Sequence, residues 1–154
     1  MKKDITFIIL STLLCISVIL EIILLANYNS EENIYKEGED IMSENVIVVI
    51  DDNVFNVNIE DNETAKEFCN ILPQEFNMSE LNGNEKYIYL DTTFTTNSYN
   101  PKHIEAGDIM LYGNNCLVVF YKSFNTSYSY TKIGHIDNLP DLGRDSINIK
   151  FEKN

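Results

Sequence analysis

The feature that most restricts the fold of this 154-residue chain is a succession of short β-prone runs beyond residue 45. Each run is rich in Val, Ile, Tyr or Phe, and most are separated by Gly, Asn or Asp turn signals. About eight such strands in one domain favour a mainly β fold, a closed or nearly closed β-barrel, because closure removes exposed strand edges. The runs are VIVVI (46–50), VFNVNIE (54–60), EFNMSEL (75–81), EKYIYL (85–90), DIMLYG (108–113), CLVVFY (116–121), SYSYTKIG (127–134) and SINIKF (146–151).

One segment has helical periodicity, EDNETAKEFCNILP at residues 60–73. Asp61 or Asn62 is placed to cap the helix N-terminus, and Pro73 ends the helix. We therefore expect one or two helices that cap the barrel, with this one packing an apolar stripe on the sheet. The stripe is formed by Ala65, Phe68, Cys69 and Leu72.

The N-terminal part has a different character. Residues 5–26 contain a single charged residue, Glu21, in 22 positions, about the length of a helix that crosses a bilayer. Lys2 and Lys3 precede this run, which favours an N-terminus in the cytoplasm and a domain on the extracytoplasmic side of the cell membrane. A cleaved secretory signal is the alternative, and the protein is then secreted. We predict three parts, a hydrophobic helix serving as anchor or signal at 1–27, an acidic linker at 28–44 and the barrel domain at 45–154.

The formal net charge of −13 lies beyond residue 27, because the four charges before it cancel. A surface of this sign repels a phosphate backbone, so we expect no nucleic acid partner. The sequence predicts one partner directly: the membrane, which the N-terminal segment would contact.

Few residues point to metal or redox chemistry. His103 and His135 are 32 residues apart and have no cysteine pair nearby. A zinc site needs three or four convergent ligands, so no metal and no cofactor is expected. Cys69 and Cys116 are expected to be small core residues, with a single disulfide between them as the alternative.

The longest specific motif is GDIMLYGNNCLVVFY at 107–121, followed by TSYSYTKIG at 126–134. With these runs, residues 46–152 resemble the bacterial cyclophilin-like domain family. The resemblance implies a cyclophilin-type fold, an eight-stranded barrel with helical caps. It does not imply a known reaction, because a shared fold carries many functions.

A peptidyl-prolyl isomerase acting on exported proteins is the one reaction that the resemblance makes worth testing. Such enzymes combine an apolar proline pocket with an arginine that donates to the prolyl nitrogen. The chain has one arginine, Arg144, which lies outside the family motif, and it has no tryptophan. We therefore assign no catalytic residues.

The aromatic residues carry the binding hypothesis. Tyr128 and Tyr130 alternate with small residues in SYSYTKIG and are expected to share one strand face with Lys132. They are explained either by cross-strand packing or by a groove for a small ligand or an extended peptide, since tyrosine suits both. A third function, a non-catalytic protein-interaction module at the cell surface, also stays open. The candidate ligand-binding residues are Tyr87, Tyr89, Asn97, Met110, Tyr112, Phe124, Tyr128 and Tyr130.

Overall fold

The computed structural model describes residues 19–22 and 45–154. Residues 19–22 are helical, and the rest of the predicted hydrophobic helix, with the acidic linker, lies outside the described residues. In the described ranges, no helix is long and apolar enough to cross a membrane. The chain divides into two units, Met1–Ser43 and Glu44–Asn154, and the fold below is that of the second unit.

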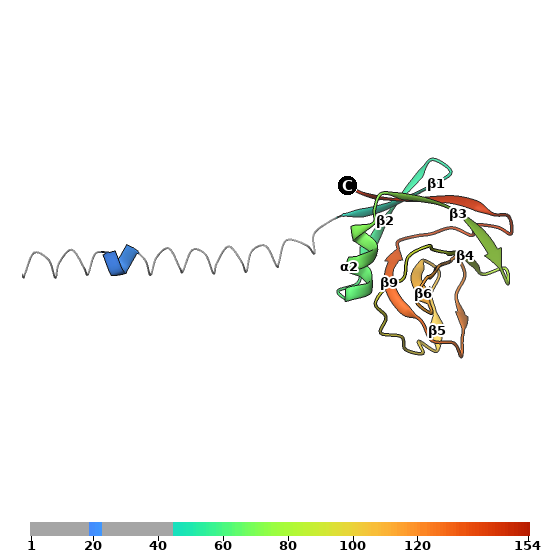
Figure 1. Cartoon of the computed structure of the whole chain (residues 1–154). Helices are drawn as coiled ribbons and strands as arrows, with labels where there is room; N and C mark the ends of the chain where they lie inside the picture. The colour runs from blue at the N-terminus through green and yellow to red at the C-terminus, as the bar shows by residue number, and fades with distance from the viewer. Residues whose placement is uncertain (1–18, 23–44) are drawn as a thin grey trace, which may run out of the picture. The chain divides into compact units, whose positions relative to one another are not determined.

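Eight antiparallel strands of this unit close into a barrel (Figure 1), in the order β1-β10-β3-β4-β7-β6-β9-β2, with β2 pairing back onto β1. Two further short strands, β5 and β8, pair with each other. The predicted closed barrel of about eight strands is confirmed. The bounds are β1 Val46–Ile50, β2 Asn53–Ile59, β3 Gln74–Leu81, β4 Glu85–Tyr89, β5 His103–Ile104, β6 Asp108–Tyr112, β7 Cys116–Phe120, β8 Phe124–Asn125, β9 Thr131–Ile136 and β10 Ile147–Lys153.

The barrel interior is filled by one apolar cluster. In β1 the buried residues are Val46, Val48 and Ile50, which follow the period of two that a strand imposes. Phe68 from the helix meets Phe151 of β10 edge to face, with ring centroids 5.2 Å apart. The inner face is therefore a packed core.

The single helix described in residues 45–154, α2 (Glu63–Asn70), packs against β9 (Figure 1). Asn62 is its N-cap, because its side-chain oxygen accepts a hydrogen bond of 2.9 Å from the backbone N–H of Ala65. The Asn62 amide nitrogen also donates to the carbonyl oxygen of Lys132 in β9, at 2.9 Å. The predicted helix, cap and buried stripe are confirmed, and the cap also joins the helix to the sheet.

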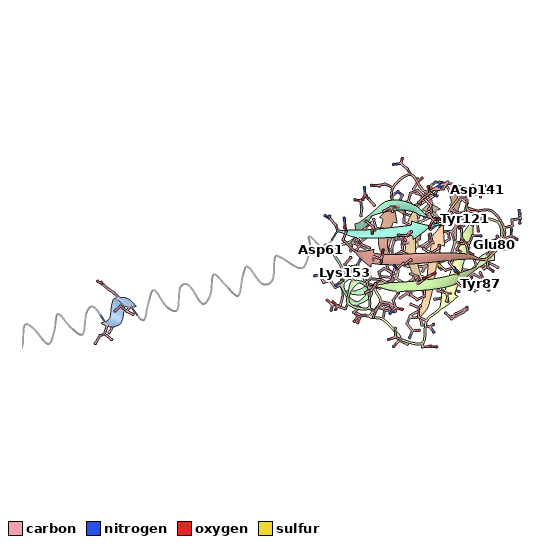
Figure 2. All side chains as sticks on the ribbon, turned by 90° about the horizontal axis from the view of Figure 1, so that it is seen from above. Asp61, Glu80, Tyr87, Tyr121, Asp141 and Lys153 are labelled. Atoms are coloured by element: carbon pink, nitrogen blue, oxygen red, sulfur yellow. The ribbon has the colours of Figure 1, made fainter. Side chains whose placement is uncertain are left out.

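A buried lysine joins the loop at residues 143–145 to the barrel wall. Lys86 of β4 is fully buried, and its ammonium group donates to the carbonyl oxygens of Gly143 at 2.8 Å and Asp145 at 2.6 Å. The same ammonium lies 5.0 Å from the centre of the Tyr121 ring. The Tyr121 hydroxyl donates to a Glu80 carboxylate oxygen at 3.3 Å, and Figure 2 shows these two residues toward the same end of the domain.

β7 is buried on both faces, as its continuous apolar sequence predicts. Its inward residues, Leu117 and Val119, belong to the interior cluster. Its outward residues belong to a second, outer cluster that also contains Ile104 of β5 and Phe124 of β8. The long connection at 91–107 contains one of these short strands, β5, which covers the outside of the barrel. The outer cluster consists of Ile104, Met110, Cys116, Val118, Phe120 and Tyr130, with Tyr87 and Phe124 packed against it.

The prediction of one continuous strand over SYSYTKIG is wrong in its first half. β9 begins at Thr131, and the register of its pairing with β6 shifts between Ile109 and Met110. Tyr130 instead exchanges two backbone hydrogen bonds with Tyr99, at 2.9 and 3.0 Å. The backbone groups of Tyr130 thus bond to the loop that contains Tyr99 and do not extend the pairing of β9 with β6.

The disulfide considered from the sequence is not formed. Cys69 packs against the interior cluster, whereas Cys116 belongs to the outer one, and the two are not joined. Both act as small core residues, as expected.

Candidate functional site

A pocket of about 300 Å³ lies on the outer face of the barrel, over β4 and β7. Strand alternation explains its floor, because Glu85, Tyr87 and Tyr89 point outward from β4 while the residues between them point inward. Across the ladder, Cys116 is paired with Tyr89 and Val118 with Tyr87. The lining residues are Leu81, Asn82, Glu85, Tyr87, Tyr89, Tyr112, Cys116, Val118, Tyr128 and Tyr130.

Five of the eight predicted site residues lie together in this pocket, namely Tyr87, Tyr89, Tyr112, Tyr128 and Tyr130. They come from β4, from the end of β6 and from the segment before β9. Three separate segments of the chain thus supply one continuous aromatic lining.

The other three predicted residues do not line the pocket. Met110 is 1% exposed in the outer cluster, and Phe124 packs on Phe120 with ring centroids 5.6 Å apart. Asn97 lies in the connection between β4 and β5, where its backbone N–H donates to the Thr131 hydroxyl at 3.1 Å. These residues support the fold around the pocket.

Sequence reasoning missed half of the lining. Glu85 is the most important omission, although its alternation with the predicted Tyr87 in EKYIYL was a usable signal. No sequence signal identified the other four missed lining residues, since strand pairing and a turn bring them to the pocket. These residues are Leu81, Asn82, Cys116 and Val118.

The tyrosine rings meet at steep angles. Tyr87 and Tyr89 have centroids 6.1 Å apart at 84°, and Tyr112 and Tyr128 have centroids 6.2 Å apart at 90°. Tyr130 lies 5.6 Å from Tyr112 at 53°. Such rings form adjoining walls rather than one stack, so ring faces and ring edges both contribute to the pocket surface.

Glu85 places a buried carboxylate in this aromatic lining. The residue is 8% exposed and accepts a hydrogen bond from the Asn82 side chain. Burial raises the pKa of the Glu85 carboxyl; the Asn82 hydrogen bond opposes this shift, and the charge of Glu80 adds to it. In residues 45–154 as described, Glu85 forms no ion pair.

Two other groups of the pocket, Tyr130 and Cys116, also have raised pKa values. Burial raises the pKa of Tyr130 to about 12, and the charge of Glu85 contributes to the shift. Burial also raises the pKa of the Cys116 thiol, again with a contribution from Glu85. A thiol with a raised pKa is a poor nucleophile, so the pocket presents hydrogen-bonding groups and ring faces rather than a reactive centre.

A second polar cluster lies outside the pocket, around the buried Asp108. One of its carboxylate oxygens is 3.1 Å from Nδ1 of His135 and 3.2 Å from Nζ of Lys132, and the other accepts from the backbone N–H of Glu105 at 2.9 Å. His135 is therefore held by a buried carboxylate, although its own side chain is 32% exposed. In the described residues no group of three or more His, Cys, Asp or Glu is arranged to hold a metal ion.

The single arginine lies beside the pocket turn and not in the pocket lining. Arg144 places its guanidinium group over Gly83, where a side chain at that position would meet it. Asn82 and Gly83 both have positive φ, 60° and 74°, as the NG turn signal predicts. The space beside Gly83 is thus used to pack Arg144 on the β3–β4 turn.

A larger hollow of about 400 Å³ lies near β4, α2 and the start of β3, with Phe76 and Leu90 among its lining residues. It contains no buried charged group. The tyrosine-lined pocket is therefore the better candidate site, because a binding site combines an apolar surface with a few placed polar groups.

A model of the Cyclophilin-like family matches residues 48–152 of this chain. In three dimensions the chain is similar to the solution structure of a hypothetical protein from Archaeoglobus fulgidus. The similarity covers 72% of this chain and 95% of that one, with 16% sequence identity and a TM-score of 0.48. No curated protein sequence matches.

Proposed function

The chain belongs to the cyclophilin-like family, as the sequence resemblance predicted, and we propose that its barrel is a non-catalytic ligand-binding domain outside the cytoplasm. The ligand site is the tyrosine-lined pocket, and its occupant is a small molecule. The observation that carries this proposal is the convergence of five tyrosines on one pocket of about 300 Å³. That volume lies at the lower end of the range for small-molecule sites.

Exposure of the rings supports binding over internal packing for part of the set. Tyr89 is 64% exposed and Tyr128 is 62% exposed, so neither is needed to fill the core. Tyr130, at 6%, has the opposite character and belongs to the outer cluster. Both explanations considered from the sequence thus apply, but to different tyrosines.

The proposed location outside the cytoplasm rests on the sequence of residues 1–27. The apolar run at 5–26 after Lys2 and Lys3 supports a tethered domain on the extracytoplasmic side, or a secreted one if the run is cleaved. Protease treatment of intact cells tests this location. Degradation of the domain in intact cells supports it, and protection until the cells are lysed overturns it.

A thermal-shift screen of the full-length protein in mild detergent tests ligand binding. The screen uses fragment-sized cationic, neutral and anionic compounds together with short extended peptides. A ligand that binds only the folded state raises the unfolding temperature. We expect at least one small compound to stabilise the wild type, and we expect the Y89S/Y128S variant to lose that stabilisation.

Y99S is the matched control, because Tyr99 is 49% exposed but does not line the pocket. A compound whose effect is lost equally in Y99S does not bind at the pocket. If no compound stabilises the wild type, or the double variant responds like the wild type, the proposal is overturned. Stabilisation by peptides alone would favour a peptide groove.

The same preparation tests the isomerase alternative in a protease-coupled proline-peptide assay. The pocket contains no arginine, so the donor that weakens prolyl amide resonance is missing from its lining. We expect no rate acceleration. Acceleration that Y89S/Y128S abolishes would replace binding by catalysis as the function of the pocket.

A further inference from the structure

The barrel domain buries two carboxylates, and they differ in their charged partners. Asp108 is 3% exposed and is compensated by Lys132 and His135, whose side-chain nitrogens lie 3.2 and 3.1 Å away. Glu85 is 8% exposed and has only the side-chain amide of Asn82. A buried charge without a counter-charge is costly, so the place beside Glu85 is one where an external cation would be bound favourably.

No positively charged side chain of residues 45–154 lines the pocket beside Glu85. The ten lining residues include no Lys, Arg or His. Lys86 follows Glu85 in the sequence, but its ammonium donates to the carbonyl oxygens of Gly143 and Asp145 on the other side of the strand. Within the described residues Glu85 thus has no positive partner, which leaves room for a cation from outside the protein.

The surroundings of Glu85 match one kind of cation in particular. Tyrosine ring faces attract a cation that lies within about 6 Å of the ring centre, and the attraction strengthens when the cation is desolvated. An inorganic cation such as Ca²⁺ is usually bound by several carboxylate and carbonyl oxygens, whereas the side chains of this lining include a single carboxylate. An ammonium group with methyl or methylene substituents satisfies both the carboxylate and the rings.

We propose that the pocket binds a small organic cation whose ammonium group is held between the Glu85 carboxylate and the pocket tyrosines. This inference rests on the proposed function and specifies the ligand class of the same site. Residues 45–154 contain 16 Asp and Glu residues against eight Lys and Arg residues, and this net negative charge also attracts cations toward the domain.

Calorimetric titration of the full-length protein with choline and with 3,3-dimethylbutan-1-ol tests the proposal. The two compounds have nearly the same shape, but only choline carries a charge. We expect choline to bind about tenfold more tightly or better, since a desolvated cation over aromatic rings gains an amount of this order. Butyrate, an anion of similar size, should show no binding.

Three variants separate the contribution of the charge from that of the rings. E85Q keeps the size of the side chain and should reduce the preference for choline to about threefold or less. Tyr128 is 62% exposed, so Y128L and Y128F should both fold. Y128F keeps a ring face and should retain choline affinity, whereas Y128L should weaken it several-fold.

Equal affinity for choline and the alcohol overturns the cation inference and leaves the pocket as a ligand site. Undiminished preference for choline in E85Q overturns it as well. If neither compound binds, the cation inference fails, and the fragment screen alone then decides the proposed function. Tighter binding of butyrate than of choline would also contradict the inference.

Discussion

Glu85 and Lys86 are consecutive residues of β4, yet their charges lie on opposite sides of the barrel wall. The period of two in a strand separates them, so the ammonium is bound by loop carbonyls while the carboxylate faces the tyrosine-lined pocket. The two charges therefore do not compensate each other.

The variant E85Q should be more stable than the wild type near pH 7. Burial raises the pKa of Glu85 in the folded state, so the folded protein holds this proton more tightly than the unfolded chain does. Stability from this group is present at low pH and is lost as the pH rises through the raised pKa. The glutamine avoids that loss.

The measurement is urea unfolding of both proteins between pH 4 and pH 8. The gain in free energy of unfolding should shrink as the pH falls toward 4.5, the usual pKa of the group. Taking the difference between the two proteins cancels the carboxylates that do not interact with Glu85, whereas Glu80, whose charge acts on Glu85, still contributes. Glu85 also interacts with Asn82, Cys116 and Tyr130. A variant less stable than the wild type at pH 7 would show that the buried carboxylate is already compensated.

Lys86→Met should lower the free energy of unfolding by about 1–3 kcal/mol. Methionine keeps much of the buried stem, but the carbonyl oxygens of Gly143 and Asp145 lose their charged donor. Lys66→Met is the matched control, because Lys66 pairs with Asp61 at the surface and its side chain is 41% exposed. The control should cost about 0.5 kcal/mol or less. Equal losses in urea unfolding would mean that the buried hydrogen bonds add nothing.

Asn62→Ala should cost about 1–2 kcal/mol, because it removes both the cap of α2 and the hydrogen bond to Lys132. Asn62→Asp keeps the oxygen that caps the helix and removes the donor, so it should cost clearly less. Urea unfolding monitored by far-UV circular dichroism measures both. If the aspartate variant loses as much as the alanine variant, the link to β9 matters more than the cap.

Gly107→Ala should destabilise the barrel by at least about 2 kcal/mol more than Gly113→Ala. Both glycines have positive φ, 102° and 61°, so both variants carry the backbone strain of a left-handed alanine. Only at Gly107 would the new methyl group meet the backbone oxygen of Ile136, whereas the space beside Gly113 is open. Thermal unfolding of the two variants gives the comparison, and similar losses would contradict the close approach.

The sequence predicts this fold well because strand alternation and turn signals are local. The alternation of EKYIYL places Tyr87 and Tyr89 on one face, and the apolar run of β7 indicates burial on both sides. The site was predicted less completely, because its other walls depend on which loop covers the outer face. Tyr130 bonds to Tyr99 rather than continuing β9, and no local pattern indicates this.

Polar residues were the weaker part of the sequence prediction for a different reason. Glu85 was omitted although it shares a face with Tyr87, because a glutamate at a strand start is usually solvated. Only the pairing of β4 with β3 and β7, which buries this position, gives the carboxylate its significance. Met110 and Phe124 were predicted as ligand-binding residues, but Met110 belongs to the outer cluster and Phe124 packs against it.

The most direct measurement of the central claim is an NMR titration of the full-length protein, with ¹³C-labelled tyrosine rings, by choline. Saturable shifts should appear at the five pocket tyrosines and be absent at Tyr99 and Tyr121, which do not line the pocket. Single Tyr→Phe variants assign the signals. Pocket tyrosines that stay unmoved, or shifts of equal size at Tyr99 and Tyr121, would contradict the account.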